Sequence, residues 1–99
     1  MKYSYIYEPR AIQEYEEAVL WYLEKSKQAA EHFENAMNEK LREVCLHPRL
    51  YRNTKKEFRE AFLKKYPYSI IYVIAEDTRT IVITSVFHNS RNPGKKYTT

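Results

Sequence analysis

Three side chains close to the C-terminus could carry acid–base chemistry at a phosphate group. His88 ends a run of apolar residues, Arg91 follows three residues later, and Tyr97 lies in the terminal segment. A histidine can exchange a proton near neutral pH, an arginine holds phosphate in a defined planar geometry, and a tyrosine adds a hydroxyl. The alternative is that His88 only caps a strand or fixes the terminal segment through a hydrogen bond.

Positive charge is concentrated in the second half of the chain. Residues 1–50 carry a net charge of −2, whereas residues 51–99 carry +6. Such a field attracts polyanions or an acidic protein, although an ordinary solvated surface would have the same composition. Tyr66, Tyr68 and Tyr97 are aromatic neighbours that could stack on a ligand. The candidates for binding a target are Arg59, Lys64, Lys65, Arg91, Lys95 and Lys96.

Several classes of site are excluded by composition. The chain has one glycine, so it has no glycine-rich phosphate loop, and we expect no nucleotide cofactor. Cys45 is the single cysteine, which excludes an internal disulfide and gives no zinc-ligand spacing. No apolar run is long enough to cross a membrane or act as a signal peptide, so we expect a cytoplasmic protein. With 99 residues, we expect one domain over residues 1–99.

The first half of the chain predicts a strand followed by two helices. Lys2–Tyr7 alternates in the way a strand does, and Pro9 suits the first turn of a helix. Ser26 is a plausible N-cap for a second helix, which should end at His47, before Pro48. The first helix should present a solvated acidic side made of Glu14, Glu16, Glu17 and Glu24.

The second half predicts an antiparallel sheet. Three segments, at residues 58–64, 68–75 and 80–87, are rich in β-branched and aromatic residues, and a four-residue loop at 76–79 joins the last two. The stretch 49–56 reads as a flexible connection. The two helices must cover one face of the sheet, so the fold class is α+β with the order β-α-α-β-β-β. The opposite face should be open and basic, and would serve to dock a partner.

Two C-terminal segments carry a resemblance to a known family. Lys64–Tyr72 and Val86–Pro93, together with the helix start at Pro9, are similar to the signature of the RelE/ParE toxin superfamily of bacterial type II toxin–antitoxin modules. The resemblance covers nearly the whole chain, and it implies the β-α-α-β-β-β fold and a cognate antitoxin partner. It leaves open the pairing of two toxin chains into a homodimer.

The resemblance implies two modes of action. Ribonuclease members cut messenger RNA on the ribosome, whereas ParE-type members poison DNA gyrase without an evident catalytic site. Nuclease members usually have an arginine at the position of Ser69, lysines near Glu60 and Phe62, and a basic residue near Asn89. A serine hydroxyl cannot replace a guanidinium that stabilises phosphate charge.

The expected function is therefore a ParE-like growth inhibitor. A ribosome-dependent endoribonuclease that uses His88, Arg91 and Tyr97 is the alternative. A degenerate member that only binds its antitoxin or operator is the third possibility.

Overall fold

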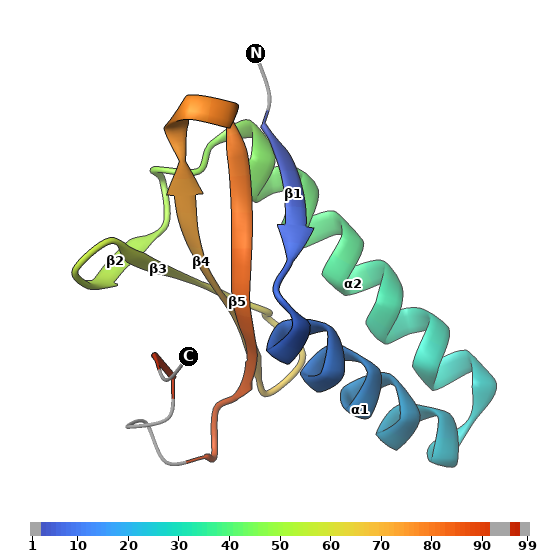
Figure 1. Cartoon of the computed structure of the whole chain (residues 1–99). Helices are drawn as coiled ribbons and strands as arrows, with labels where there is room; N and C mark the ends of the chain where they lie inside the picture. Colours follow the sequence, from blue (N-terminus) through green and yellow to red (C-terminus); the bar gives the residue numbers. More distant parts are fainter. Residues whose placement is uncertain (1–2, 92–95, 98–99) are drawn as a thin grey trace.

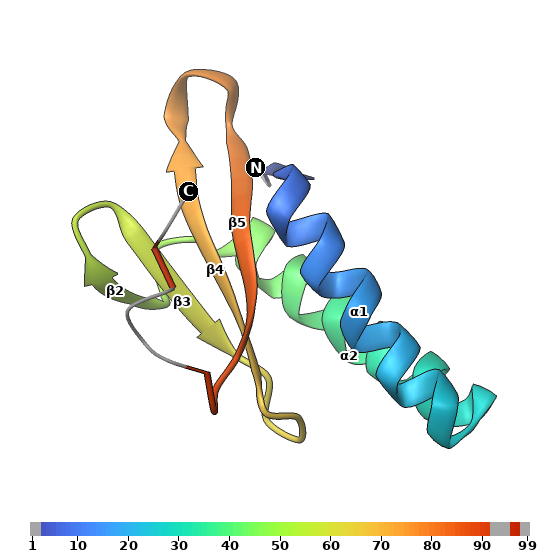
Figure 2. The same cartoon turned by 60° about the horizontal axis from the view of Figure 1, so that its bottom comes forward.

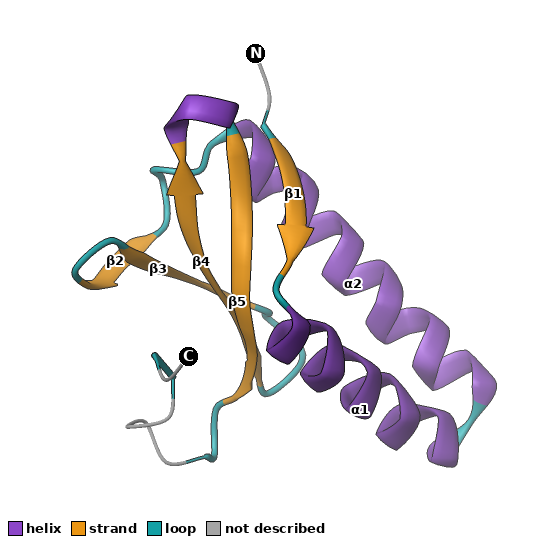
Figure 3. Cartoon of the chain, in the orientation of Figure 1, coloured by secondary structure: helices purple, strands orange, loops and turns teal. Residues whose placement is uncertain are grey.

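The computed structural model describes residues 3–91 and 96–97 (Figure 1). The elements follow one another in the predicted order, with one additional strand (Figure 3). Their bounds are β1 Ser4–Tyr7, α1 Pro9–Lys25, α2 Lys27–Leu46, β2 Arg52–Lys55, β3 Phe58–Phe62, β4 Tyr68–Ala75, the 3-10 turn η1 Glu76–Thr78 and β5 Thr80–His88.

The two helices begin and end where local sequence predicts. Pro9 occupies the first turn of α1, where its missing N–H costs no hydrogen bond. Ser26 is the N-cap of α2, and its hydroxyl accepts a hydrogen bond from the backbone N–H of Ala29 at 2.9 Å. Helix α2 ends at Leu46, because Pro48 disfavours helical geometry in the residue before it. These predictions are confirmed.

All five strands belong to one mixed sheet with the order β1-β5-β4-β3-β2. Strands β2 to β5 pair antiparallel with their neighbours, whereas β1 pairs parallel with β5 from Thr80 to Ile83. Strand β2 was not expected: the stretch read as a flexible connection instead forms the strand at the far edge of the sheet. Its polar sequence, Arg-Asn-Thr-Lys, carries no apolar alternation, because an edge strand with two solvated sides needs none.

Both helices pack on the same face of the sheet, as Figures 1 and 2 show from two directions. The core between these layers is formed by one stripe of each helix and by the side chains that strands β3 to β5 point toward them. Cys45 is a free cysteine buried within this core. The largest fully buried side chains of the core are those of Tyr72, Phe33, Met37, Leu41, Ile70, Ile81 and Ile83. No helix among the described residues is long and apolar enough to span a membrane.

Candidate functional site

Arg91 lies against helix α1. Its guanidinium nitrogen Nη1 is 3.1 Å from Glu14 Oε2, and Nη2 is 4.0 Å from Glu17 Oε1. Its side chain is 45 % exposed. The candidate phosphate clamp is therefore already paired with two carboxylates, and an incoming phosphate would have to compete with them.

Glu14 corrects the expectation of a uniformly solvated acidic face on α1. It is buried, and its Oε1 accepts hydrogen bonds from Ser85 Oγ at 2.7 Å and from the backbone N–H of Val86 at 2.9 Å. Arg10 Nε lies 3.3 Å from Oε2. Glu14 follows Ala11 by three residues and precedes Ala18 by four, so helical periodicity places it on the same side of α1 as these two buried residues, and β5 passes beneath that side. Sequence alone does not reveal which strand lies there.

His88 ends strand β5 and is held by local contacts. The backbone N–H of Ser90 donates to His88 Nδ1 at 3.1 Å, and Ser90 Oγ lies 2.7 Å from the same nitrogen. Tyr68 packs its ring edge-on at 4.9 Å. Because a backbone N–H can only donate, Nδ1 is the acceptor and the neutral ring carries its proton on Nε2. In this arrangement the Nδ1 lone pair of His88 is engaged by Ser90.

Tyr97 lies near the opposite end of the sheet. Its hydroxyl donates to Thr54 Oγ1 at 2.6 Å, and its ring centroid is 5.0 Å from that of Phe58. Phe58 precedes Arg59, which pairs with Tyr72, whereas His88 pairs with Tyr68. The positions on β4 opposite Phe58 and opposite His88 are therefore five residues apart, which is about 16 Å at about 3.3 Å per residue. The structure does not bring Tyr97 and His88 together.

The sheet face opposite the helices has an acidic centre. Glu60 is 3 % exposed, and Lys96 Nζ binds its carboxylate at 3.0 and 3.2 Å while lying 5.3 Å above the ring of Phe87. Beside them Ser69 Oγ donates to Asn89 Oδ1 at 2.7 Å. Lys96 is thus paired with Glu60 and neutralises its charge. In the part of the chain that the structure describes, the centre of this face therefore holds a paired carboxylate and ammonium instead of the expected broad cationic surface.

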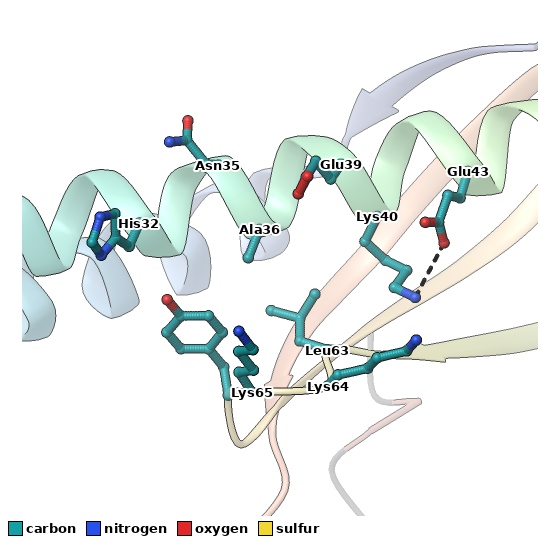
Figure 4. Close-up of a pocket in the computed structure, with 10 residues that line it drawn as sticks. His32, Asn35, Ala36, Glu39, Lys40, Glu43, Leu63, Lys64 and Lys65 are labelled. Carbon is teal, nitrogen blue, oxygen red and sulfur yellow. Dashed lines mark hydrogen bonds and ion pairs between the residues drawn. The ribbon is translucent and has the colours of Figure 1, made fainter.

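Lys64 and Lys65 lie on the helix side of the sheet. Together they form one wall of a groove against α2, and the Leu63 side chain points from the same wall toward the helix (Figure 4). The other wall carries Lys40, which binds Glu43 at 3.3 Å, so both signs of charge are present. Tyr66 and Tyr68 also lie on this side, where their rings pack on Phe33 rather than facing a ligand on the open face.

Arg59 has a structural position at the far side of the sheet. Its Nη1 donates to the carbonyl oxygens of Tyr51 at 2.8 Å and of Arg49 at 3.4 Å. It thereby ties strand β3 to the segment that leaves α2. The remaining candidate, Lys95, lies outside the described residues. The predicted target-binding residues that the structure describes therefore lie in four separate places: Arg91 against α1, Lys96 beside Glu60, Lys64 and Lys65 beside α2, and Arg59 beside Tyr51.

Two exposed carboxylates that bind tyrosine hydroxyls, Glu43 and Glu76, have lowered pKa values. Hydrogen bonds from Tyr51 and Lys40 lower the pKa of Glu43, and hydrogen bonds from Arg49 and Tyr3 lower the pKa of Glu76. Burial, followed by the bond to Glu43, raises the pKa of Tyr51 to about 12. These pairings stabilise the fold locally. None of them involves His88, Arg91 or Tyr97.

Nothing in the described part of the chain gathers three or more His, Cys, Asp or Glu side chains in a way that could hold a metal ion. Buried side-chain nitrogen and oxygen atoms in this part of the chain all have hydrogen-bond partners. The described polar groups inside the fold are therefore already satisfied by the protein itself.

Comparison with known proteins places this geometry in a family. No curated protein matches the chain. Among solved structures, the isolated RelE toxin of E. coli is similar with a TM-score of 0.65 and 18% identity, over 93% of this chain and 89% of that one. At that identity the likeness concerns the fold. The model of the ParE toxin of type II toxin–antitoxin systems, parDE, matches residues 5–93. A match of that extent, on a fold shared with RelE, means that this chain belongs to the ParE toxin family and is the toxin of a type II toxin–antitoxin system.

Proposed function

We propose that the chain inhibits growth by binding DNA gyrase, without catalysing a reaction of its own. The observation that supports this most is the separation of the three side chains that a nuclease would need. His88 is held by Ser90, Arg91 is paired with Glu14, and Tyr97 lies beside Thr54 near the other end of the sheet. General acid–base catalysis requires such groups within hydrogen-bond reach of one reacting phosphate.

The open face of the sheet supports the same proposal. A site for phosphoryl chemistry needs fixed positive groups around the charge that develops in the transition state. Here the centre of the face holds the Glu60–Lys96 pair and the Ser69–Asn89 hydrogen bond. Among the described residues, the buried carboxylate of Glu60 is neutralised by Lys96 alone, and without that lysine it would repel a phosphate. A protein target imposes no such electrostatic requirement.

A cognate antitoxin would silence the toxin by covering its exposed apolar surface. Helix α1 and strand β1 expose large apolar side chains, among them Leu20 at 58% and Trp21 at 51%. Exposed apolar side chains of this size are typical of interaction surfaces. The basic charge of the chain favours an acidic partner segment. The exposed set comprises Tyr5, Ile6, Ile12, Leu20, Trp21 and Leu23.

Purified toxin and purified gyrase test the proposal directly. Supercoiling of a relaxed plasmid should slow as toxin is added, cleaved plasmid should accumulate, and addition of the antitoxin should reverse both effects. In bacteria that express the toxin alone, growth should stop and DNA breaks should appear.

The alternative, a ribosome-dependent endoribonuclease, predicts a different outcome. Primer extension on transcripts from intoxicated cells would then show discrete cuts within translated codons, and supercoiling would be unaffected. A chain that binds its antitoxin tightly but leaves growth, gyrase and transcripts unchanged would be a degenerate member. Either result would replace the proposal.

A further inference from the structure

The β2–β3 hairpin carries a group of cations that the candidate site does not use. Arg52, Lys55 and Lys56 are all exposed, and they lie within five residues of one another. None of them takes part in an ion pair with another described residue. Glu57 is the one carboxylate in the turn. The hairpin therefore presents uncompensated positive charge, unlike Arg91 and Lys96, which are paired.

The hairpin projects from the sheet as a two-stranded ribbon. Strand β4 pairs with β3 only between Arg59 and Phe62, so the part of the hairpin from Lys55 to Phe58 forms no ladder with β4. Figures 1 and 2 both show this turn pointing away from the two helices. The cations are thus displayed on the side of the molecule away from the two helices.

The ribbon is held in shape by its own side chains. Asn53 Nδ2 donates to the carbonyl oxygens of Lys56 at 2.8 Å and of Phe58 at 3.1 Å. Tyr97 binds Thr54 at 2.6 Å and lies beneath Lys55, whose Nζ is 5.5 Å from the centre of its ring. Lys56 adopts a left-handed conformation with φ of 51°. Fixing the turn in advance lowers the entropic cost of binding.

We propose that the tip of this hairpin binds the phosphate backbone of duplex DNA. The major groove of B-DNA admits a two-stranded β-ribbon, and cations on such a ribbon reach the phosphates at its sides. The choice of DNA as the polyanion rests on the proposed function, because gyrase acts on duplex DNA. The toxin would then hold gyrase and DNA together instead of contacting the enzyme alone.

A short fluorescein-labelled DNA duplex of mixed sequence, titrated with the full chain in a salt series, tests this proposal. Each phosphate contact contributes about 0.9 to the slope of log K against log salt, so replacing three cations should lower the slope by between two and three units. The test variant is R52Q/K55Q/K56Q. We expect at least a tenfold loss of affinity at low salt, with an unchanged urea unfolding midpoint.

The matched control removes the same charge elsewhere. Lys25, Lys27 and Arg42 are exposed cations on the helices, and K25Q/K27Q/R42Q has the same net charge as the hairpin variant. The control should keep the affinity and the salt slope of the original chain. Equal losses in both variants would mean general charge attraction and would overturn the proposal. An RNA duplex bound as tightly would also overturn it, because the narrow major groove of A-form RNA excludes a ribbon.

The binding assay contains no gyrase, so its result is separate from the test of the proposed function. If the chain does not bind DNA but still inhibits gyrase, the hairpin proposal alone is wrong. DNA binding through the hairpin without any effect on supercoiling removes the gyrase proposal alone.

Discussion

The carboxylate of Glu14 accepts a hydrogen bond from the backbone N–H of Val86 at 2.9 Å, and so joins helix α1 to the edge of strand β5. Strand β1 pairs with β5 only as far as Ile83, and the backbone N–H of Glu8 donates a hydrogen bond to the carbonyl oxygen of Ile83. Beyond Ile83, the Glu14 side chain accepts the hydrogen bond that a neighbouring strand would otherwise accept from β5. Helix α1 is thereby fixed on the sheet by a polar contact as well as by its apolar stripe.

Replacing Glu14 with alanine should destabilise the fold by about 2–3 kcal/mol, because the buried N–H of Val86 and the Ser85 hydroxyl lose their acceptor. Glu14→Gln keeps an acceptor oxygen and should cost about 1 kcal/mol. Urea denaturation followed by circular dichroism measures both. The control is Glu17→Ala, since the Glu17 side chain is 55 % exposed and should change stability by less than about 0.5 kcal/mol. A Glu14→Ala protein as stable as this control would contradict the assignment.

The Glu60–Lys96 pair should show strong coupling. The Glu60 side chain is 2% exposed and that of Lys96 is 19%, so removing the cation leaves a buried carboxylate without a counter-charge. Lys96→Met should cost about 3 kcal/mol, and the double variant Glu60→Gln/Lys96→Met should recover most of that loss. A double-mutant cycle by urea denaturation measures the coupling, with Lys65→Met as an exposed control. Additive losses would show that the two residues act independently.

His88 should be dispensable for growth inhibition. Under the proposed binding mechanism, His88→Asn keeps a polar side chain beside Ser90 and should leave both toxicity and gyrase inhibition within about twofold of the original. Removing a general acid or base would instead cost about a hundredfold or more. Tyr97→Phe should be similarly tolerated. Colony counts after induction and supercoiling assays make the comparison. A loss of a hundredfold or more in toxicity with an unchanged unfolding midpoint would point instead to catalysis.

Stability should fall at alkaline pH. The pKa of Tyr51 is raised to about 12 from an ordinary value of 10, by burial and then by its bond to Glu43. Burial also raises the pKa of Tyr7 and Tyr72. The unfolded chain therefore releases these protons at a lower pH than the folded one. Their contribution is complete below about pH 10 and is lost as the pH rises toward 12.

Urea midpoints measured across this range, with tyrosinate absorbance recorded in parallel, follow the effect. Tyr51→Phe should flatten the decline, because it removes one of the groups that titrate differently in the two states. A midpoint that does not change up to pH 12 would contradict the raised pKa of Tyr51.

The sequence by itself determined the elements whose signals are local. Apolar spacing, Pro9, Ser26 and Pro48 set the two helices, and runs of β-branched residues set β4 and β5, because these preferences act over a few neighbouring residues. Sequence signature also identified the superfamily.

Tertiary structure decided what depends on residues far apart in the chain. The edge strand β2 has no apolar alternation to reveal it, and the parallel pairing of β1 depends on which edge of the sheet is free. Glu14 is buried because β5 passes beneath it, and Lys96 neutralises Glu60, which is distant in the sequence. His88, Arg91 and Tyr97 are close in sequence, yet their side chains contact Ser90, helix α1 and strand β2, respectively. Proximity along the chain does not fix direction in space, which only the packing of the whole fold determines.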